Sequence, residues 1–136
     1  MNSGRFAISV HILTLLRFAG NEWLPSDYLA GSINVNPVLV RKELINLRKQ
    51  GLVLSKEGKS GGSKLARPAE KILMSEIYTA VRPNNLLGKG INSPNPACPV
   101  GRKINDNLDE LYASTELSLI NSLGKKTLSE FCKKFV

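Results

Sequence analysis

The sequence predicts a mainly α-helical domain with one small β-hairpin and a long, one-sided helix near its C-terminal end. Three observations lead to this fold class. Apolar residues recur at helical spacing over most of the chain, with capping residues between the segments. A glycine-rich stretch between short apolar runs, residues 58–68, indicates a turn between two strands. Residues 101–123 keep their apolar side chains on a single face.

Composition limits the class of protein. The apolar fraction of 42% is sufficient for a packed core. The longest apolar run, residues 6–18, is too short and too polar to span a membrane, and the N-terminus lacks a signal-peptide pattern. Two cysteines fit a reducing compartment better than a disulfide framework. We therefore expect one compact cytoplasmic domain with no membrane partner.

The net charge of +8 is unevenly distributed along the chain. Residues 41–71 hold nine basic and three acidic side chains, so three quarters of the excess lies in this window. Charge alone leaves several interpretations open: a solvated face, nucleic acid, an anionic membrane surface or an acidic protein partner.

Two helices are expected at the N-terminal end. The first covers residues 5–18 and ends at Gly20, with one apolar face (Phe6, Val10, Leu13 and Leu16). The second is short, residues 27–33, with the Ser26 hydroxyl as its expected N-cap.

The third helix is the clearest local pattern, at residues 37–50. Asn36 can cap it, Pro37 suits the first helical position, and Gly51 is placed to end it in a left-handed conformation. Its apolar stripe is Val40, Leu44 and Leu47, and the opposite side is largely basic (Arg41, Lys42, Arg48 and Lys49). This order of helices is typical of a helix-turn-helix, although an ordinary three-helix bundle with a basic surface has the same periodicity.

Two short strands follow, within residues 52–58 and 63–68, joined by a loop at residues 59–62. A hairpin directly after a recognition helix makes a winged helix, whose tip would carry Lys59, Ser60 and Lys64. The Gly-Lys-Ser triplet at its centre also resembles the end of a nucleotide-binding loop. That loop requires a first glycine where Val53 stands and a helix where Gly61 and Gly62 stand, so we reject an NTPase.

Three further segments complete the chain. A helix is expected at residues 69–81, with Ile72 (or Leu73), Ile77 and Val81 inward, followed by a Pro-, Gly- and Asn-rich loop. The long helix from Gly101 is expected to be a subunit interface, with packing inside one subunit as the alternative; its seam comprises Ile104, Leu108, Leu111, Thr115 and Leu119. The last helix would carry Leu128, Phe131 and Phe135 on one face.

Several motifs together resemble one family. They are the wing pattern G-x-x-G-G-x-x-L-A-R-P leading to Tyr-x-Ala-Val, and the segments SGRFAISVHIL, NVNPVLVRKELINLRKQGLV, CPVGRKINDNL and TLSEF. In these the chain resembles the bacterial winged helix-turn-helix repressors that include the iron–sulfur-cluster regulator, the nitric-oxide-sensitive repressor and the cysteine-metabolism repressor (IscR, NsrR and CymR). The resemblance spans essentially the whole chain.

The resemblance implies a dimeric, DNA-binding transcription regulator. It divides the chain into a winged helix-turn-helix region (1–68), a connecting helix with a sensor-type loop (69–100) and a dimerisation part (101–136). The expected DNA-binding residues are Arg5, Ser26, Asn36, Pro37, Val38, Arg41, Lys42, Lys59, Ser60, Gly61, Gly62 and Lys64. Ser26 has capping as its first expected role, and Arg48 and Lys49 are expected to form a solvated helix end.

The cluster-binding members carry three cysteines in the loop before the long helix, whereas this chain has Cys98 alone. One thiolate with no nearby histidine does not hold an iron–sulfur cluster in the usual way, so no cofactor and no metal are expected. Cys98 is either a redox-reactive thiol, which the helix N-terminus and Arg102 would favour, or an inert residue. Cys132 is expected to act as a small hydrophobe, and His11 as a packed or surface residue.

The sequence thus predicts a repressor that binds double-stranded DNA as a homodimer on a roughly palindromic operator. A small-molecule or protein effector is left open. A protein–protein adaptor with the same fold and weak DNA binding is the alternative. An enzyme is not expected and no catalytic residue is assigned, because no nucleophile–base pair or metal-ligand cluster is visible.

Overall fold

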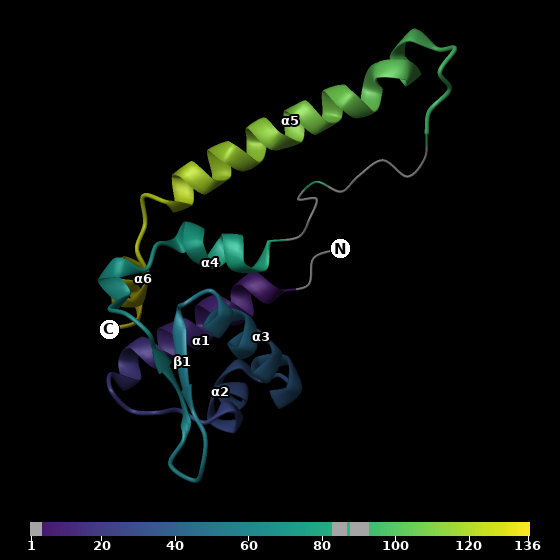
Figure 1. Ribbon diagram of the computed structural model, residues 1–136. Coiled ribbons are helices and arrows are strands. Elements are labelled where there is room, and N and C mark those ends of the chain that lie inside the picture. The colour runs from purple at the N-terminus through teal and green to yellow at the C-terminus, as the bar shows by residue number, and fades with distance from the viewer. Residues whose placement is uncertain (1–3, 83–86, 88–92) are drawn as a thin grey trace.

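The computed structural model describes residues 4–82, 87 and 93–136, and the structural statements below concern these residues. The chain is mainly helical with one two-stranded antiparallel sheet (Figure 1), which confirms the predicted fold class. In chain order the elements are α1 (Arg5–Ala19), α2 (Ser26–Ile33), α3 (Pro37–Lys49), β1 (Val53–Lys56), β2 (Gly62–Leu65), the 3-10 helix η1 (Ala69–Lys71), α4 (Met74–Val81), α5 (Pro99–Leu123), α6 (Leu128–Cys132) and the 3-10 helix η2 (Lys133–Phe135).

Helix α1 lies at the centre of the body and contacts α2, α3, α4, α6 and β2. The core around it consists of fully buried aliphatic side chains from most of these elements, including Ile12, Leu13, Leu16, Leu29, Val40, Leu47, Ile72, Ile77 and Leu128. Burying each such side chain contributes about 1.5–3 kcal/mol. The winged-helix body therefore has a hydrophobic core of its own around α1.

The expected ends of α3 are confirmed. The Asn36 side chain accepts a hydrogen bond of 2.8 Å from the Val38 N–H, and Pro37 occupies the first helical position. Gly51 follows the helix with φ of +76°, a conformation that glycine adopts without a steric penalty. The expected N-cap of α2 is wrong: Pro25 holds that position, its carbonyl accepts from Tyr28 and Leu29, and Ser26 is the first helical residue.

The single helix expected at residues 69–81 is also wrong. The chain forms η1, passes through extended backbone at Ile72, and only then starts α4 at Met74. The reason is a tertiary contact: Leu73 pairs with Thr127, the Leu128 N–H donates to the Ile72 carbonyl, and the Met74 N–H donates to Lys126. The C-terminal segment thus holds residues 72–74 extended, and α6 returns to the body beside η1.

Helix α5 differs from every other long helix in the described chain. It has 25 residues and none of them is buried. Figure 1 shows that it lies alongside α4 near its C-terminal end and extends well beyond the body at its N-terminal end. No helix in the described residues is long and apolar enough to cross a membrane.

The C-terminal face predicted to comprise Leu128, Phe131 and Phe135 is only partly correct. Leu128 and Cys132 are buried in the core, as expected for Cys132 acting as a small hydrophobe. Phe135 is 59% exposed because α6 ends at Cys132 and a 3-10 turn follows, although its ring still lies 5.3 Å from that of Phe131.

Candidate nucleic-acid interface

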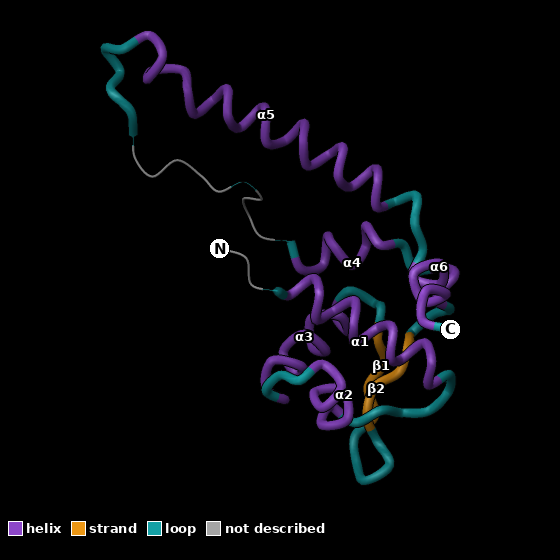
Figure 2. The backbone as a smooth tube through the Cα atoms, turned by 180° about the vertical axis from the view of Figure 1, so that it is seen from behind, coloured by secondary structure: helices purple, strands orange, loops and turns teal. Residues whose placement is uncertain are grey.

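The elements predicted to meet DNA lie at the end of the molecule opposite α5. Figure 2 shows α2, α3 and the β1–β2 hairpin at this end, with the hairpin loop projecting beyond the helices. The structure therefore brings the recognition helix and the wing to one region of the surface.

The first turns of α3 present a mixed polar and apolar surface. Asn36, Arg41 and Lys42 are exposed, as is Val38 at 59%, whereas Pro37 is half-buried. Leu39 is also exposed, at 47%, although the sequence reasoning did not select it. Exposed aliphatic groups beside polar ones suit major-groove reading, where a thymine methyl group offers an apolar contact.

Tyr28 on α2 was likewise missed, and it is 58% exposed. The sequence feature that could have indicated Tyr28 is an aromatic residue in the first turn of a short helix. Its phenol can donate to phosphate oxygens from the helix that precedes a recognition helix.

Two buried or part-buried polar contacts fix the orientation of α3. The Arg5 guanidinium forms a bidentate ion pair with Glu43, whose side chain is only 4% exposed, at 2.7 Å (Nε to Oε2) and 3.1 Å. The Glu43 hydrogen bond raises the pKa of Arg5 further, against a smaller opposing effect of burial. On another side of α3, the Asn46 side-chain amide donates to the Ala80 carbonyl of α4 at 2.8 Å.

This geometry bears on the expected role of Arg5. Two of its donors are used by Glu43, so the residue joins α1 to α3. A phosphate contact at Arg5 stays a prediction, but Arg5 is first of all part of the scaffold that holds the recognition helix.

A cleft of about 220 Å³ separates α3 from the hairpin. It is lined by Ser26 from α2, Arg41 and Arg48 from α3, and Ser55 from β1, together with Leu44, Ile45, Gly62 and Ser63. Ser26 and Arg41 were predicted site residues, and the structure brings them together. Arg48 is exposed in the last turn of α3, as expected for a solvated helix end, and it also lines this cleft because the hairpin lies beside the C-terminal half of α3.

The hairpin glycines have steric roles. Gly62 has φ of +149°, and a Cβ there would lie 2.4 Å from the backbone of Leu24. The backbone of Leu24 is held close because its N–H and its carbonyl both form hydrogen bonds with the backbone of Ser63. A Cβ on Gly61 would lie 2.1 Å from the Lys56 carbonyl oxygen. Both glycines thus allow the close backbone approach that shapes the wing.

The basic residues of the hairpin lie in two places, the loop and the strands. Lys59 and Ser60 are exposed in the loop. Opposite residues of an antiparallel pair lie on the same face, which places Lys64 with Leu54, away from the Ser55–Ser63 pair that lines the cleft. The Lys64 ammonium lies 4.6 Å from the centre of the Trp23 ring. The expected place of Lys64 at the wing tip is therefore wrong: Lys64 stands within β2 and, with Lys56, lies over the Trp23 ring, a surface that the sequence did not indicate.

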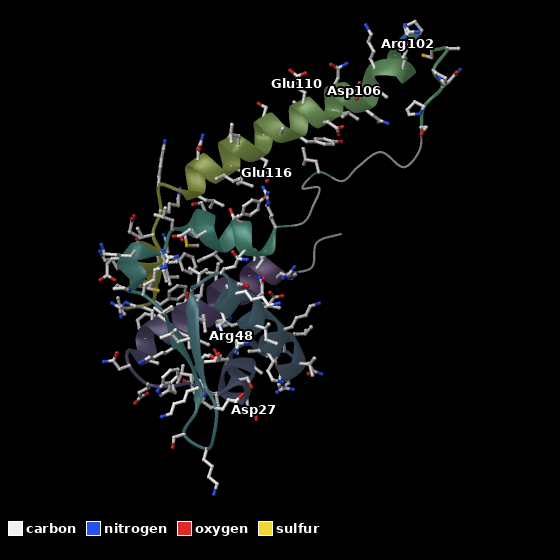
Figure 3. The ribbon with its side chains drawn as sticks, viewed as in Figure 1. Asp27, Arg48, Arg102, Asp106, Glu110 and Glu116 are labelled. Carbon is white, nitrogen blue, oxygen red and sulfur yellow. The ribbon has the colours of Figure 1, made fainter. Side chains whose placement is uncertain are left out.

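The sensor candidate Cys98 lies far from these elements. It is exposed and caps α5, with its Sγ accepting from the Gly101 N–H at 3.4 Å. Figure 3 shows Arg102, Asp106 and Glu110 on the part of α5 that extends beyond the body, and Glu116 closer to α4. Glu116 forms an ion pair with Arg82 at the end of α4. His11 lies on α1 with its Nε2 3.1 Å from the Ser32 hydroxyl.

The expected dimerisation seam lies along one side of α5. Leu111 is 57% exposed and Thr115 is exposed, whereas Ile104, Leu108 and Leu119 are half-buried. Within one chain, none of the five residues is fully buried.

A helix-turn-helix followed by a hairpin, with arginines and lysines gathered on its recognition side, defines a winged-helix DNA-binding protein. Comparison with known proteins gives the family. The chain belongs to the Rrf2 family, described as iron-dependent transcriptional regulators, which it matches over residues 2–134. It is a DNA-binding transcription regulator.

Individual relatives agree with this assignment. The chain is 37% identical over 130 residues to YwnA of Bacillus subtilis, which carries the provisional name of an HTH-type transcriptional regulator; the match covers 96% of both chains. It is also 37% identical over 79 residues to the regulator IscR of Cereibacter sphaeroides, covering 57% of this chain and 51% of IscR.

Solved structures show the same fold. A crystal structure of a provisionally assigned DNA-binding protein is 33% identical, with a TM-score of 0.75 over 93% of this chain and 97% of its own. The structure of CymR, the global cysteine regulator of B. subtilis, is 19% identical, with a TM-score of 0.64 over 98% of this chain and 97% of its own.

The residues present do not fit an iron–sulfur cluster, despite the family description. Such clusters are held by sets of thiolates, with histidine in some cases. The chain contains two cysteines and one histidine; Cys132 is buried in the core and Cys98 is exposed at the start of α5. Within the described residues, no three His, Cys, Asp or Glu side chains are grouped to hold a metal ion.

Proposed function

We propose that the protein is a homodimeric repressor that binds a roughly palindromic operator. The observation that carries this proposal is α5, a 25-residue helix with no buried residue. An apolar seam of that length is typical of a helix that pairs with a second copy of itself. Two α3 helices related by a two-fold axis would enter major grooves about 34 Å apart.

The roles of the contact residues follow from their positions. Asn36, Val38 and Lys42 would meet base edges and phosphates in the major groove. Lys59 and Ser60, in the projecting loop, would contact the adjacent minor groove or its phosphates. A repressor of this kind would act in the cytoplasm, where bacterial DNA lies, and would need no catalytic residue and no cofactor.

The test is a fluorescence-anisotropy titration with a duplex from the region upstream of the protein's own gene and a scrambled duplex of equal length. We expect tighter binding to the natural duplex. We also expect affinity to fall steeply as salt rises, because phosphate contacts release counterions. Equal affinity for the two duplexes at all salt concentrations would reject sequence-specific regulation through this region and favour the adaptor alternative.

We further propose Cys98 as the site that responds to oxidants. Its sulfur is exposed and accepts from a backbone N–H at the N-terminus of α5, where a negative charge is stabilised. The test compares DNA affinity of the wild type and Cys98→Ser before and after mild peroxide. A response in the wild type alone supports the proposal, and identical responses exclude Cys98 as the switch.

A further inference from the structure

A cavity of about 610 Å³ runs along α1, on the side of the body that carries α6. Its walls come from α1, α4, α6 and η2, and they include Phe6, Phe18, Phe131 and Phe135. These are all four phenylalanines of the chain, and they come from its two ends. A concave site of this volume with a mainly apolar and aromatic lining is typical of a small-molecule site.

The aromatic rings of the cavity are accessible from solvent. Phe18 is 46% exposed and Phe135 is 59% exposed, whereas Phe6 and Phe131 are half-buried. The rings of Phe131 and Phe135 lie 5.3 Å apart at an interplanar angle of 59°. Rings in such tilted arrangements accept a further ring by offset stacking or edge-to-face contact. The lining therefore favours a flat aromatic ligand over a strongly hydrated molecule such as a sugar.

Positive charge lies at the edge of the cavity. The carbon of the Arg17 guanidinium lies 5.9 Å from the centre of the Phe18 ring. Lys133 and Lys134 are exposed in η2, the turn that contributes Phe135 to the cavity wall. None of these three cations forms an ion pair with a described residue, and the residues that line the cavity include no carboxylate. An acidic group on the ligand would supply the counter-charge.

The cavity is separate from the proposed dimer contact. Figure 1 shows α6 at the left of the body and the projecting end of α5 at the upper right, and Figure 2 shows the same separation from behind. The seam is a row of side chains on one helix, whereas the cavity is a hollow with walls from four elements. A second copy joined through the projecting part of α5 would therefore lie away from the α6 wall.

A molecule in the cavity would touch the helix that orients the recognition helix. Seven of the lining residues lie on α1, and Arg5 in the first turn of the same helix forms the ion pair with Glu43 of α3. The lining also includes Met74, whose N–H donates to the Lys126 carbonyl of the C-terminal segment. A ligand that binds one arrangement of α1 and α6 better than another shifts the population toward it, and α3 moves with α1.

We propose that this cavity binds a small aromatic acid, with its ring system among the four phenylalanines and its acidic group beside Arg17, and that its occupancy changes the affinity of the protein for DNA. The part that concerns DNA rests on the proposed function, whereas the binding site does not.

The first arm of the experiment measures binding of anilinonaphthalenesulfonate, an aromatic sulfonate whose fluorescence rises in apolar sites, to the protein without DNA. We expect saturable binding that Phe18→Ala weakens about tenfold and Arg17→Gln about threefold. Leu54→Ala is the control, because Leu54 is also 46% exposed but lies on β1 and does not line the cavity. It should change the affinity by less than about twofold. Equal binding by the wild type and Phe18→Ala would overturn the site.

The same titration at several protein concentrations tests whether a second copy is the occupant. Dye binding per chain that stays constant while the protein dimerises supports a small-molecule site. Dye binding that disappears as the dimer forms would overturn it.

The second arm measures affinity for the duplex from upstream of the protein's own gene, with and without saturating dye. We expect the dye to change the affinity of the wild type at least about threefold and to leave Phe18→Ala unchanged. Unchanged DNA affinity of the dye-bound wild type would overturn the regulatory role. If the dye binds the cavity while no duplex binds, the binding site is supported and the proposed function fails. Thermal unfolding checks that each variant is folded.

Discussion

Helices α1 and α5 are both long and amphipathic, but only α1 is buried. Helix α1 has 15 residues, six of which are buried against the rest of the body. Helix α5 has 25 residues and buries none. A helix in a globular protein draws most of its stability from packing its apolar face. The comparison shows that α1 packs its apolar side chains inside the body, whereas α5 leaves all of its apolar side chains at least partly exposed, which is why we propose that α5 pairs with a second copy.

The largest expected effect is in the body. Leu47 of α3 is fully buried, so Leu47→Ala removes apolar contacts and leaves a cavity. We expect the free energy of unfolding to fall by about 2–5 kcal/mol, measured by urea denaturation at fixed protein concentration. Ile45→Ala, on the same helix but 47% exposed, should cost about 1 kcal/mol or less. A similar loss of unfolding free energy in the two variants would show that α3 does not pack against the body through the face that carries Leu47.

The next prediction concerns α5. Leu111→Asp places a charge in the proposed seam and should raise the dimer dissociation constant at least tenfold, about 1.4 kcal/mol, measured by sedimentation velocity. Leu117→Asp is the control, because Leu117 is 62% exposed on the opposite side of the same helix. If Leu117→Asp dissociates the dimer and Leu111→Asp does not, the seam has been assigned to the wrong face.

The wing provides a third test, now of backbone geometry. In Gly62→Ala the new Cβ meets the Leu24 backbone at an unfavourable φ, and stability should fall by about 1–3 kcal/mol. Gly31 on α2 has no atom near its would-be Cβ, so Gly31→Ala should stabilise the protein by about 0.5–1 kcal/mol. Thermal unfolding of the two variants compares them directly. A neutral Gly62→Ala would contradict the close approach of the 23–25 segment.

The smallest effect involves the ion pair between Arg67 and Glu76. Burial raises the pKa of Glu76, but hydrogen bonds from Arg67 and the Leu73 N–H outweigh it, so the folded pKa lies below the ordinary 4.5. Its contribution is therefore present above pH 4.5 and is lost as pH falls through the folded pKa. Glu76→Gln should cost about 0.2–1 kcal/mol at pH 7 and less at pH 3, by urea denaturation. A cost that does not change with pH would contradict the ion pair, and exposed Glu70→Gln is the control.

Sequence patterns predicted the elements whose signals are local. Asn36, Pro37 and Gly51 set the ends of α3 because a cap depends on neighbouring residues. The break at Ile72 could not be predicted, because it depends on pairing with residues 126–128, more than fifty positions later.

The site shows the same division. Lys59 and Ser60 were correctly expected in an exposed loop, since the glycine-rich turn is a local signal. The cleft role of Arg48 and the turning of Lys64 towards Trp23 depend on how the hairpin folds against α3 and the 20–25 connection. The spacing of residues along the sequence does not predict how the hairpin packs against α3 and the 20–25 connection.

The most direct test of the account is the mass of the protein bound to DNA. A duplex is first selected by the protein from a random library, and the complex is then weighed by light scattering. We expect a palindromic sequence and a complex of one duplex with two chains of 14.9 kDa each. One chain per duplex, or no selected sequence, would contradict the claim that the body binds DNA while α5 joins two copies.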